Sequence, residues 1–317
     1  MSDCSMIRAS APGSIMLMGE HAVLRGALAI ACAVDRYIHV ELRPRDDDRV
    51  CVDSALGVYE STLGELAESS ELKFVIAALR QWRSHLASGF ELKITSEFSH
   101  RVGLGSSAAV IAALTVVLDR FAGTGFSTEQ LFDSALKVIH QVQNGRGSGT
   151  DLAASLYGGV IAYRVEPREL IPLKGLPTLS LWYVGYKMKT PDVLELVETK
   201  RQRYPELYDG LDRLMEQCSL NARAAVDNSD WNALGELMNV YQGLMDALGV
   251  CDGNLAELVY RLRSAEGVLG AKISGSGLGD CVVALGSAKF GDLRFEEIPI
   301  GLSARGTESE QLAESRS

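Results

Sequence analysis

A run of small residues, GLGSSAA at 103–109, separates two segments with different hydrophobic periodicity. The preceding residues 90–98, FELKITSEF, alternate as a half-buried strand does, and residues 106–121 are apolar with helical spacing. A helix that starts directly after such a turn has N–H groups without intrahelical acceptors at the positive end of its dipole. Because glycine lets an anion approach the backbone closely, the junction predicts an anion site in front of a helix.

The junction alone does not define a function, because a serine N-cap and a glycine turn account for the same residues. It lacks the G-K-[ST] ending of a Walker A loop and lies far from a first βαβ unit, where a dinucleotide fingerprint belongs. An NAD-dependent oxidoreductase also requires an acidic residue about 20 positions after the loop at a strand end. Asp119 and Glu129 lie near that distance but within helical pattern. We therefore disfavour a redox enzyme.

The rest of the chain alternates between strand and helix patterns, which predicts an α+β fold in two parts. In the first part we expect strands at 27–34, 36–44 and 90–98, helices at 71–86, 106–121 and 127–142, and a loop with a short helix at 147–159. In the second we expect strands at 179–186 and on both sides of the glycines in 270–285, and helices at 191–203, 206–227, 230–248 and 254–266.

Prolines cluster in VEPRELIPLKGLP, residues 165–177, where the composition changes. We place the boundary there, which gives an N-terminal domain at 1–170 and a C-terminal domain at 171–303. The polar residues 304–317 are expected to be a disordered tail.

The charge balance argues against a nucleic-acid surface, since 41 acidic residues outnumber 31 basic ones and no basic cluster stands out. No signal peptide is evident, and no apolar run reaches the roughly 18 residues that span a bilayer. The six cysteines form no C-x-x-C pair, which favours free thiols in a reducing compartment. We therefore expect a cytoplasmic protein with a small-molecule partner, and neither nucleic acid nor membrane as partner.

Two further stretches carry polar residues among small ones. APGSIMLMGEHAVLRG, residues 11–26, places Glu20 beside His21 after an apolar strand. GRGSGTDLAASLYGG, residues 145–159, places Asp151 at the start of a short helix, where the dipole favours a carboxylate even without any function.

Together, and in this order, the three stretches and KISGSGLGDCVVAL, residues 272–285, resemble the motifs of the GHMP kinases. The resemblance runs from about residue 8 to residue 286. It implies an N-terminal domain like ribosomal protein S5 domain 2, with a left-handed β-α-β crossover, and a C-terminal ferredoxin-like domain. It also implies an ATP-dependent kinase of small molecules that uses Mg²⁺.

The resemblance assigns a role to each matching residue. Asp151 would be the catalytic aspartate, which takes or orients the proton of the substrate alcohol. The ATP phosphates would lie on the backbone of Gly103, Leu104, Gly105, Ser106, Ser107 and Ala108. Substrate contacts would come from Glu20, His21, Ser148, Thr190, Gly275 and Ser276. Ser107 is the first candidate ligand of Mg²⁺, followed by Asp151 and then His140.

Three positions depart from the family pattern. Ser14 occupies the place of a lysine that pairs with the catalytic aspartate, and Lys187, Lys189 or Arg146 could replace that charge. His140 occupies the place of a glutamate that binds Mg²⁺ in many members. Arg101 stands where the family has a Pro-x-Gly-x segment and could offer the phosphates a positive charge.

The substrate is less defined than the family. GEHAVLRG is most similar to mevalonate kinases, which implies phosphorylation of the 5-hydroxyl of mevalonate in isoprenoid biosynthesis. AVDRYIHV, GSGTDLAASLYGG and GDC are also similar to phosphomevalonate kinases, so phosphomevalonate is the alternative. Because of Ser14, a ligand-binding relative with weak or no catalysis is a further alternative. Mevalonate kinases are often dimers, which makes a homodimer an expectation by analogy.

Overall fold

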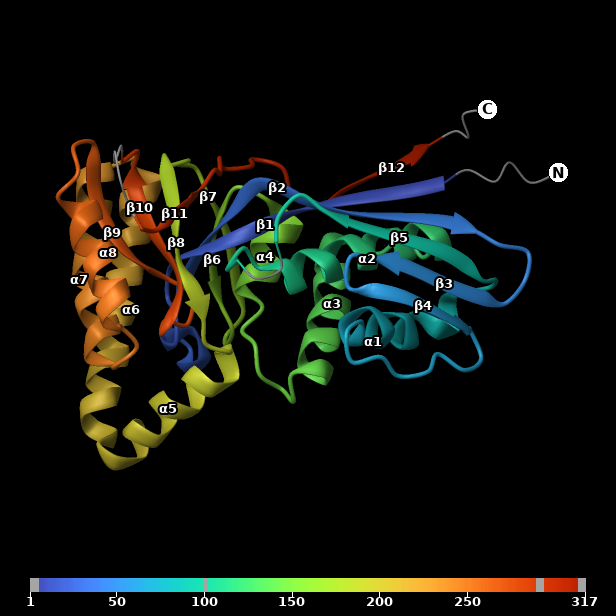
Figure 1. The fold of residues 1–317 in the computed structure, drawn as a ribbon, viewed down its shortest axis with the longest axis horizontal. Coiled ribbons are helices and arrows are strands. Elements are labelled where there is room, and N and C mark those ends of the chain that lie inside the picture. Colours follow the sequence, from blue (N-terminus) through green and yellow to red (C-terminus); the bar gives the residue numbers. More distant parts are fainter. Residues whose placement is uncertain (1–5, 100–101, 289–293, 313–317) are drawn as a thin grey trace.

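The computed structural model describes residues 6–99, 102–288 and 294–312, and everything below refers to these residues. Two α/β halves lie next to each other along the long axis of the molecule (Figure 1), each with its own sheet.

The first half is built on an eight-stranded sheet. Its strands are β1 (Met6–Met18), β2 (Ala29–Pro44), β3 (Arg49–Ser54), β4 (Gly57–Thr62), β5 (Phe90–Ser96), β6 (Val160–Arg164), β7 (Glu169–Leu173) and β12 (Glu308–Leu312). The main order is β12-β1-β2-β5-β3-β4, with β6 paired to β2 and β7 to β6. The pairs are antiparallel except for β3 and β5, which are parallel and are connected through β4 and a helix.

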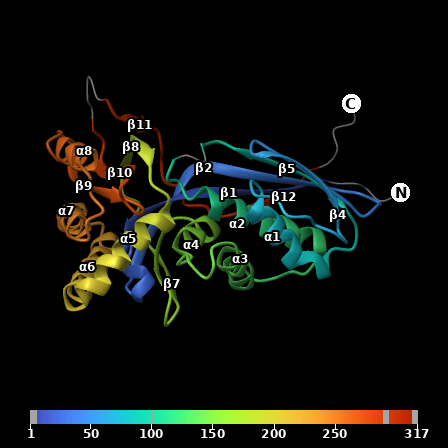
Figure 2. The ribbon, with the colours of Figure 1, turned by 60° about the horizontal axis from the view of Figure 1, so that its bottom comes forward.

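Four helices cover one face of this sheet (Figure 2): α1 (Lys73–Trp82), α2 (Ser106–Ala122), α3 (Thr128–Val142) and α4 (Thr150–Tyr157). α2 lies against β1 and β2 and also contacts the other three helices. It therefore needs apolar residues on most of its surface, and the run from Ala108 to Leu118 is nearly all buried. A helix that is apolar on most sides is stable only in such a central place.

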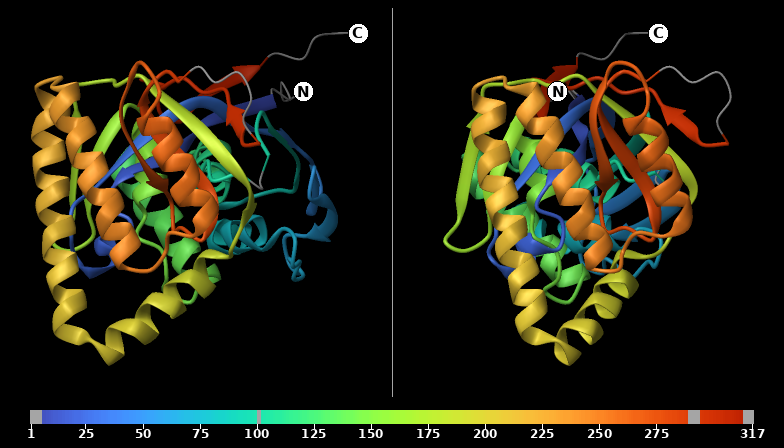
Figure 3. Two further views of the ribbon diagram at one scale, coloured as in Figure 1. Left: turned by 60° about the vertical axis from the view of Figure 1, so that its left-hand side comes forward. Right: turned by 90° about the vertical axis from the view of Figure 1, so that its left-hand side faces the viewer.

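The second half is built on a four-stranded antiparallel sheet in the order β11-β8-β10-β9. These strands are β8 (Leu179–Lys187), β9 (Val268–Ser274), β10 (Gly279–Gly286) and β11 (Glu296–Ile298). Its helices are α5 (Thr190–Arg203), α6 (Pro205–Asp227), α7 (Trp231–Ala247) and α8 (Gly253–Arg263). α7 and α8 pack on this sheet, and α5 meets α6 at a sharp bend (Figure 3).

The two halves share one hydrophobic core at their junction. Buried residues of β1 and β2, including Ile15, Leu17 and Ile30, belong to the same cluster as Leu181 of β8 and Tyr241 of α7. A second cluster fills the space between the first sheet and α1–α4. Because apolar side chains join the halves, the loops at the junction have a firmly held framework.

The structure confirms the expected helices and most of the expected strands, and the two-part α+β architecture agrees with the resemblance. The strands expected at 27–34 and 36–44 are one continuous strand, β2. The hairpin of β3 and β4 and the strand β7 had not been foreseen. The handedness of the β3–β5 crossover stays a prediction.

The expected disordered tail at 304–317 is wrong for the part that the structure describes. Residues 308–312 form β12, which pairs antiparallel with β1, and Arg120 donates a hydrogen bond to Ser309 Oγ at 3.1 Å. Backbone hydrogen bonds to an open sheet edge explain why a polar sequence is ordered here. β7 crosses the expected boundary at residue 170 and β12 returns to the first sheet, so the domain limits stay a prediction.

Within the described ranges no helix is long and apolar enough to cross a bilayer. Cys32, Cys218 and Cys281 are buried free thiols, and Cys51 and Cys251 are half-buried free thiols. The expectation of free thiols is confirmed for these five, while Cys4 lies outside the described residues.

Candidate active site

The glycine-serine loop is pressed against β1 at the start of α2. Gly105 is the N-cap of α2 in the left-handed conformation, with φ 61°. A Cβ atom at this position would lie 2.1 Å from Ser14 Oγ and 3.5 Å from the Cβ of Asp151. At Gly103, a Cβ atom would lie 2.5 Å from a carboxylate oxygen of Asp280. Both glycines are therefore required by close packing, and both lie against charged or polar side chains from other segments.

The structure narrows the anion site predicted at 103–108. The amide of Leu104 donates to the Val102 carbonyl at 2.8 Å, and the carbonyl of Leu104 accepts from the amide of Ser14 at 3.0 Å. The amide of Leu104 is therefore used within the loop, while the role of the loop backbone in phosphate binding stays a prediction.

The amides from Gly105 to Ala108 are the ones at the start of α2 that an anion could use. These are the first four N–H groups of α2, which have no intrahelical acceptor, and no side chain caps them. Ser107 is exposed on the first turn of this helix.

Asp151 lies on the first turn of α4, close to this loop. Its Oδ1 accepts a hydrogen bond from Ser14 Oγ at 2.8 Å. Burial raises the pKa of Asp151, whereas the Ser14 hydrogen bond and the charge of Lys187 act to lower it and the charge of Asp280 acts to raise it. A buried carboxyl with a raised pKa beside a helix N-terminus is suited to general base chemistry.

Glu20 and His21 contact the third glycine motif, between β9 and β10. His21 Nε2 is hydrogen-bonded to the carbonyl of Ser276 at 2.9 Å, and the backbone of Gly275 acts to lower the pKa of the Glu20 carboxyl. His21 is nearly buried in the left-handed conformation, with φ 60°. Desolvation by burial lowers the pKa of His21, so its ring is neutral at pH 7.

Glu20 was expected to contact the substrate, but its side chain is buried and faces Lys272. Its carboxylate forms an ion pair with Lys272 of β9, and both side chains are almost fully buried. Burial raises the pKa of Glu20 and lowers that of Lys272, and the attraction between them opposes both shifts. Glu20 Oε2 is buried without a hydrogen-bond partner among the described residues. Sequence inspection did not single out Lys272, although its place at the start of KISGSG was visible.

The remaining predicted residues lie at the edges of the site. Ser148 Oγ is hydrogen-bonded to Thr150 Oγ1 at 2.8 Å, in the turn that leads into α4. Thr190 is exposed at the start of α5. His140 Nε2 is hydrogen-bonded to the carbonyl of Gly147 at 3.0 Å. This contact gives His140 a structural role in holding the loop before α4.

Among the three cations proposed to replace the lysine missing at Ser14, Lys187 is the one whose charge acts on Asp151. Lys187 Nζ also lies 2.5 Å from Asp280 Oδ2. Asp280, at the start of β10, is therefore a charged member of the site that our sequence analysis had not selected. Arg101 lies outside the described residues.

Mg²⁺ takes one or two protein carboxylates and otherwise waters and phosphate oxygens. The described residues contain no group of three or more His, Cys, Asp or Glu side chains that could hold a metal by themselves. Asp151 packs close to Gly105, and Ser107 follows two residues later on the first turn of α2. A carboxylate and a hydroxyl are oxygen donors of the kind that a magnesium ion shared with phosphate uses.

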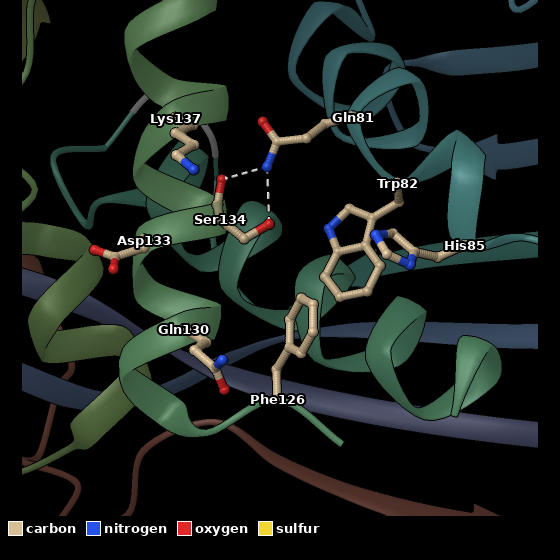
Figure 4. Close-up of a pocket in the computed structure, with 8 residues that line it drawn as sticks. All are labelled: Gln81, Trp82, His85, Phe126, Gln130, Asp133, Ser134 and Lys137. Atoms are coloured by element: carbon tan, nitrogen blue, oxygen red, sulfur yellow. Dashed lines mark hydrogen bonds between the residues drawn. The ribbon is translucent and has the colours of Figure 1, made fainter. Parts of the chain in front are cut away.

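A pocket of about 380 Å³ lies at the other end of the helical layer (Figure 4). It is lined by Trp82, His85 and Phe126, with polar side chains of α3 opposite them. α2 has 17 residues, and its length of about 25 Å separates Phe126 from the loop at Gly105. The pocket contains none of the predicted site residues and does not belong to the candidate active site.

Comparison with known proteins matches both halves of the chain to one family. Residues 72–159 match the model of the GHMP kinases N terminal domain, and residues 222–290 match that of the GHMP kinases C terminal. The chain is 36% identical over 287 residues to a mevalonate kinase of Aeropyrum pernix, with 88% of each chain covered. It is 33% identical over 301 residues to a mevalonate kinase of Pyrococcus horikoshii, again with 88% of each covered.

Solved structures show the same fold. A mevalonate kinase of L. major in complex with R-mevalonate has a TM-score of 0.73 at 26% identity and covers 88% of this chain and 87% of its own. A phosphomevalonate kinase of Streptococcus pneumoniae, in complex with phosphomevalonate and AMPPNP, has a TM-score of 0.77 at 16% identity, with 93% and 99% covered. The second likeness concerns the fold alone.

Proposed function

Because this chain belongs to the GHMP kinase family, we propose that it transfers the γ-phosphoryl group of ATP to the 5-hydroxyl of mevalonate. Curated relatives called mevalonate kinases, at 33–36% identity over most of the chain, support this substrate. Phosphoryl transfer depends mainly on positioning and on stabilisation of charge, and both follow from the site described above.

The start of α2 receives the phosphates. The amides from Gly105 to Ala108 point along the helix axis into the space beside Asp151, and the dipole adds positive potential there. Glycine at 105 keeps that space open, since a side chain would collide with Ser14. The same glycine thus brings the phosphate chain next to the residue that handles the proton.

Asp151 accepts the proton of the attacking hydroxyl. Ser14 donates its hydroxyl hydrogen to Oδ1, which fixes the carboxylate and stabilises its ionised form. Burial acts in the opposite sense and makes the carboxylate a stronger base than an exposed aspartate. The result is a general base that is oriented by a neutral partner.

The substrate lies between the first and third motifs. With Nε2 donating to the Ser276 carbonyl, the neutral ring of His21 leaves Nδ1 as an acceptor, and Nδ1 has no partner among the described residues. We assign the substrate contacts to His21 and to the loop at Gly275 and Ser276. Ser148 and Thr190 form the outer edges of the same site. Glu20 acts indirectly, because its ion pair with Lys272 holds this loop in place.

Ser107 and Asp151 are the residues that would hold Mg²⁺ together with phosphate oxygens. When bound, the ion supplies positive charge that offsets the charge developing on the transferred group. His140 is not assigned to it, because its Nε2 is bonded to Gly147. The expected homodimer and cytoplasmic location stay predictions.

One observation carries the proposal: Gly105, at the start of α2, packs closely against Ser14 and Asp151, which are hydrogen-bonded to each other. The test is ADP release from ATP and Mg²⁺ with mevalonate, phosphomevalonate, homoserine or galactose as acceptor. We expect the highest kcat/KM with mevalonate. We also expect Asp151→Asn to lower kcat by about 10³-fold or more while nucleotide affinity stays within a few-fold.

The panel also tests the alternatives. A preference for phosphomevalonate would assign the chain as a phosphomevalonate kinase, an alternative that the residues GDC at 279–281 favour. Nucleotide binding without turnover on any acceptor would favour a ligand-binding protein. The neutral Ser14 in place of the family lysine is the feature that favours this alternative. Equal activity of Asp151→Asn and the wild type would remove Asp151 from its assigned role.

A further inference from the structure

Lys187 and Asp280 form a charged pair at the edge of the second sheet. Lys187 ends β8 and Asp280 begins β10, and the neighbouring residue Gly279 is the register partner of Lys187. Lys187 Nζ lies 2.5 Å from Asp280 Oδ2. Both residues are held by adjacent strands, so the pair is a rigid unit of the second half of the chain.

Asp280 has features that a pair kept for stability does not need. Its backbone has φ 71°, a conformation that aspartate adopts more readily than most other residues apart from glycine and asparagine. Its side chain is only 3% exposed, and Oδ1 is buried without a hydrogen-bond partner among the described residues. A buried charge is unfavourable unless it is paired, and Lys187 is the cation recorded beside it. Burial of the charge and the unpartnered Oδ1 together indicate that the position of this carboxylate serves a function.

The pair faces the proposed catalytic carboxylate across the glycine-serine loop. The carboxylate of Asp280 lies against Gly103, and Asp151 lies against Gly105, two residues further along the same loop. The charge of Lys187 acts on Asp151 as well as on Asp280. Ser14, by contrast, offers Asp151 only a neutral hydroxyl. A lone neutral donor leaves a buried carboxylate without a compensating charge.

We propose that Lys187 supplies the positive charge at the catalytic carboxylate of Asp151, and that Asp280 is the positioning residue that holds Lys187 there. The inference rests on the proposed function, because it concerns the same site. Its consequence is that the cation comes from the second half of the chain, whereas Ser14 and Asp151 belong to the first. The charge at the site is therefore complete only when the two halves are in register.

A purely structural pair makes a different prediction. Lys187 is 34% exposed, and a half-exposed ion pair contributes little to stability. Its loss should then leave both kcat and KM nearly unchanged. A loss of kcat at constant KM is what a group acting on the catalytic carboxylate predicts.

The first experiment compares kinetics of Lys187→Met, Asp280→Asn and the double variant. We expect Lys187→Met to lower kcat by about 10²–10³-fold with KM within about threefold, as for loss of one charge-stabilising group. Lys187→Arg should keep more activity than Lys187→Met. Lys189→Met, two residues further along the exposed chain, is the matched control and should keep its kcat.

Asp280→Asn should lower kcat less, by about 10–100-fold, and the double variant should be no worse than Lys187→Met alone. Effects of the two single changes that multiply in the double variant would show that they act separately, and would overturn the positioning role. A kcat of Lys187→Met close to that of the control would overturn the proposal as a whole.

The second experiment needs no turnover. Thermal unfolding is measured for Lys187→Met, Asp151→Asn and both together in the ligand-free protein. Removing a buried carboxylate should raise Tm, and it should raise Tm more when Lys187 is absent, with a difference on the order of 2 °C. Shifts that simply add would show that Lys187 does not act on Asp151. A coupled shift without turnover on mevalonate would leave this inference standing while the proposed substrate fails.

Discussion

Two lysine–carboxylate pairs of the second sheet can be compared directly. Lys272 and Glu20 are almost fully buried and join the two halves of the chain, with side chains 0% and 2% exposed. Lys187 and Asp280 belong to one half, and the lysine is 34% exposed at the mouth of the site. The chemistry of the two pairs is the same, but the water around them differs.

The difference in exposure distinguishes a pair that stabilises the fold, Lys272 and Glu20, from a pair proposed to act in catalysis, Lys187 and Asp280. In the dry pair, neither ion can be solvated, so loss of one partner leaves an uncompensated charge in the core. In the second pair only Lys187 is partly exposed and can be solvated on its own, whereas Asp280 is buried. Because water reaches one of the two partners, we expect loss of this pair to cost the fold less than loss of the dry pair and to change the potential at the site. We therefore expect mutations of the first pair to appear in unfolding experiments and mutations of the second in kinetics.

The largest expected effect is on the buried pair. Glu20→Gln keeps the shape of the side chain but leaves Lys272 charged and unpaired in the core. We expect the free energy of unfolding to fall by about 3–5 kcal/mol in guanidinium titrations. The double variant Glu20→Gln/Lys272→Met is the control, and it should recover part of the loss. A decrease in the free energy of unfolding of less than about 1 kcal/mol for Glu20→Gln would show that this pair does not stabilise the junction of the two halves.

The second effect is the pH dependence of kcat, which depends on the ionisation of Asp151. Asp151 must be ionised to accept a proton, and burial raises its pKa above the ordinary aspartate value. We expect kcat to fall by about tenfold for each pH unit below that raised pKa. A rate that stays flat from pH 7 down to about pH 4, the ordinary range of an exposed aspartate, would contradict the shift.

Stability should follow the opposite trend for the same group. The folded state holds the Asp151 proton more tightly than the unfolded chain, so its contribution to the free energy of unfolding decreases as pH rises through the raised pKa. The difference in stability between wild type and Asp151→Asn, measured from pH 4 to 8, isolates this contribution from the other carboxylates.

A smaller effect is expected from Ser107→Ala at the start of α2. Removing one neutral oxygen donor should raise the Mg²⁺ concentration for half-maximal rate by about fivefold, close to 1 kcal/mol. Ser106→Ala is the matched control, because its hydroxyl precedes the assigned ligand by one residue. An equal metal dependence in both variants would remove Ser107 from the metal site.

The smallest effect is expected from an exposed ion pair, which tests whether burial or the link between the two halves gives an ion pair its effect on stability. Arg25 and Glu198 also link the two halves, but their side chains are 48% and 43% exposed. Arg25→Gln should change the free energy of unfolding by less than about 1 kcal/mol and should not change kcat. A loss as large as that of Glu20→Gln would mean that linking the halves matters more than burial.

The local sequence pattern predicted most helices and strands of this protein, because each type of element has its own period of apolar residues. The apolar run after Ser106 and the alternation at 90–98 became α2 and β5 at nearly the expected bounds. Glycines before a helix marked the anion site, since the geometry of a helix start depends only on neighbouring residues. β12 was missed because its order comes from pairing with β1, about 300 residues away in sequence.

By itself, the sequence determined the two-part α+β architecture and the family, and it indicated the carboxylate and loop of the proposed site. Only the tertiary structure decided that Glu20 pairs with Lys272, that the amide of Leu104 is hydrogen-bonded within its own loop, and that Lys187 pairs with Asp280. The physical reason is distance along the chain. Periodicity and capping are local, whereas the partner of a charge is selected by which distant strands the fold brings together and by how much water is left between them.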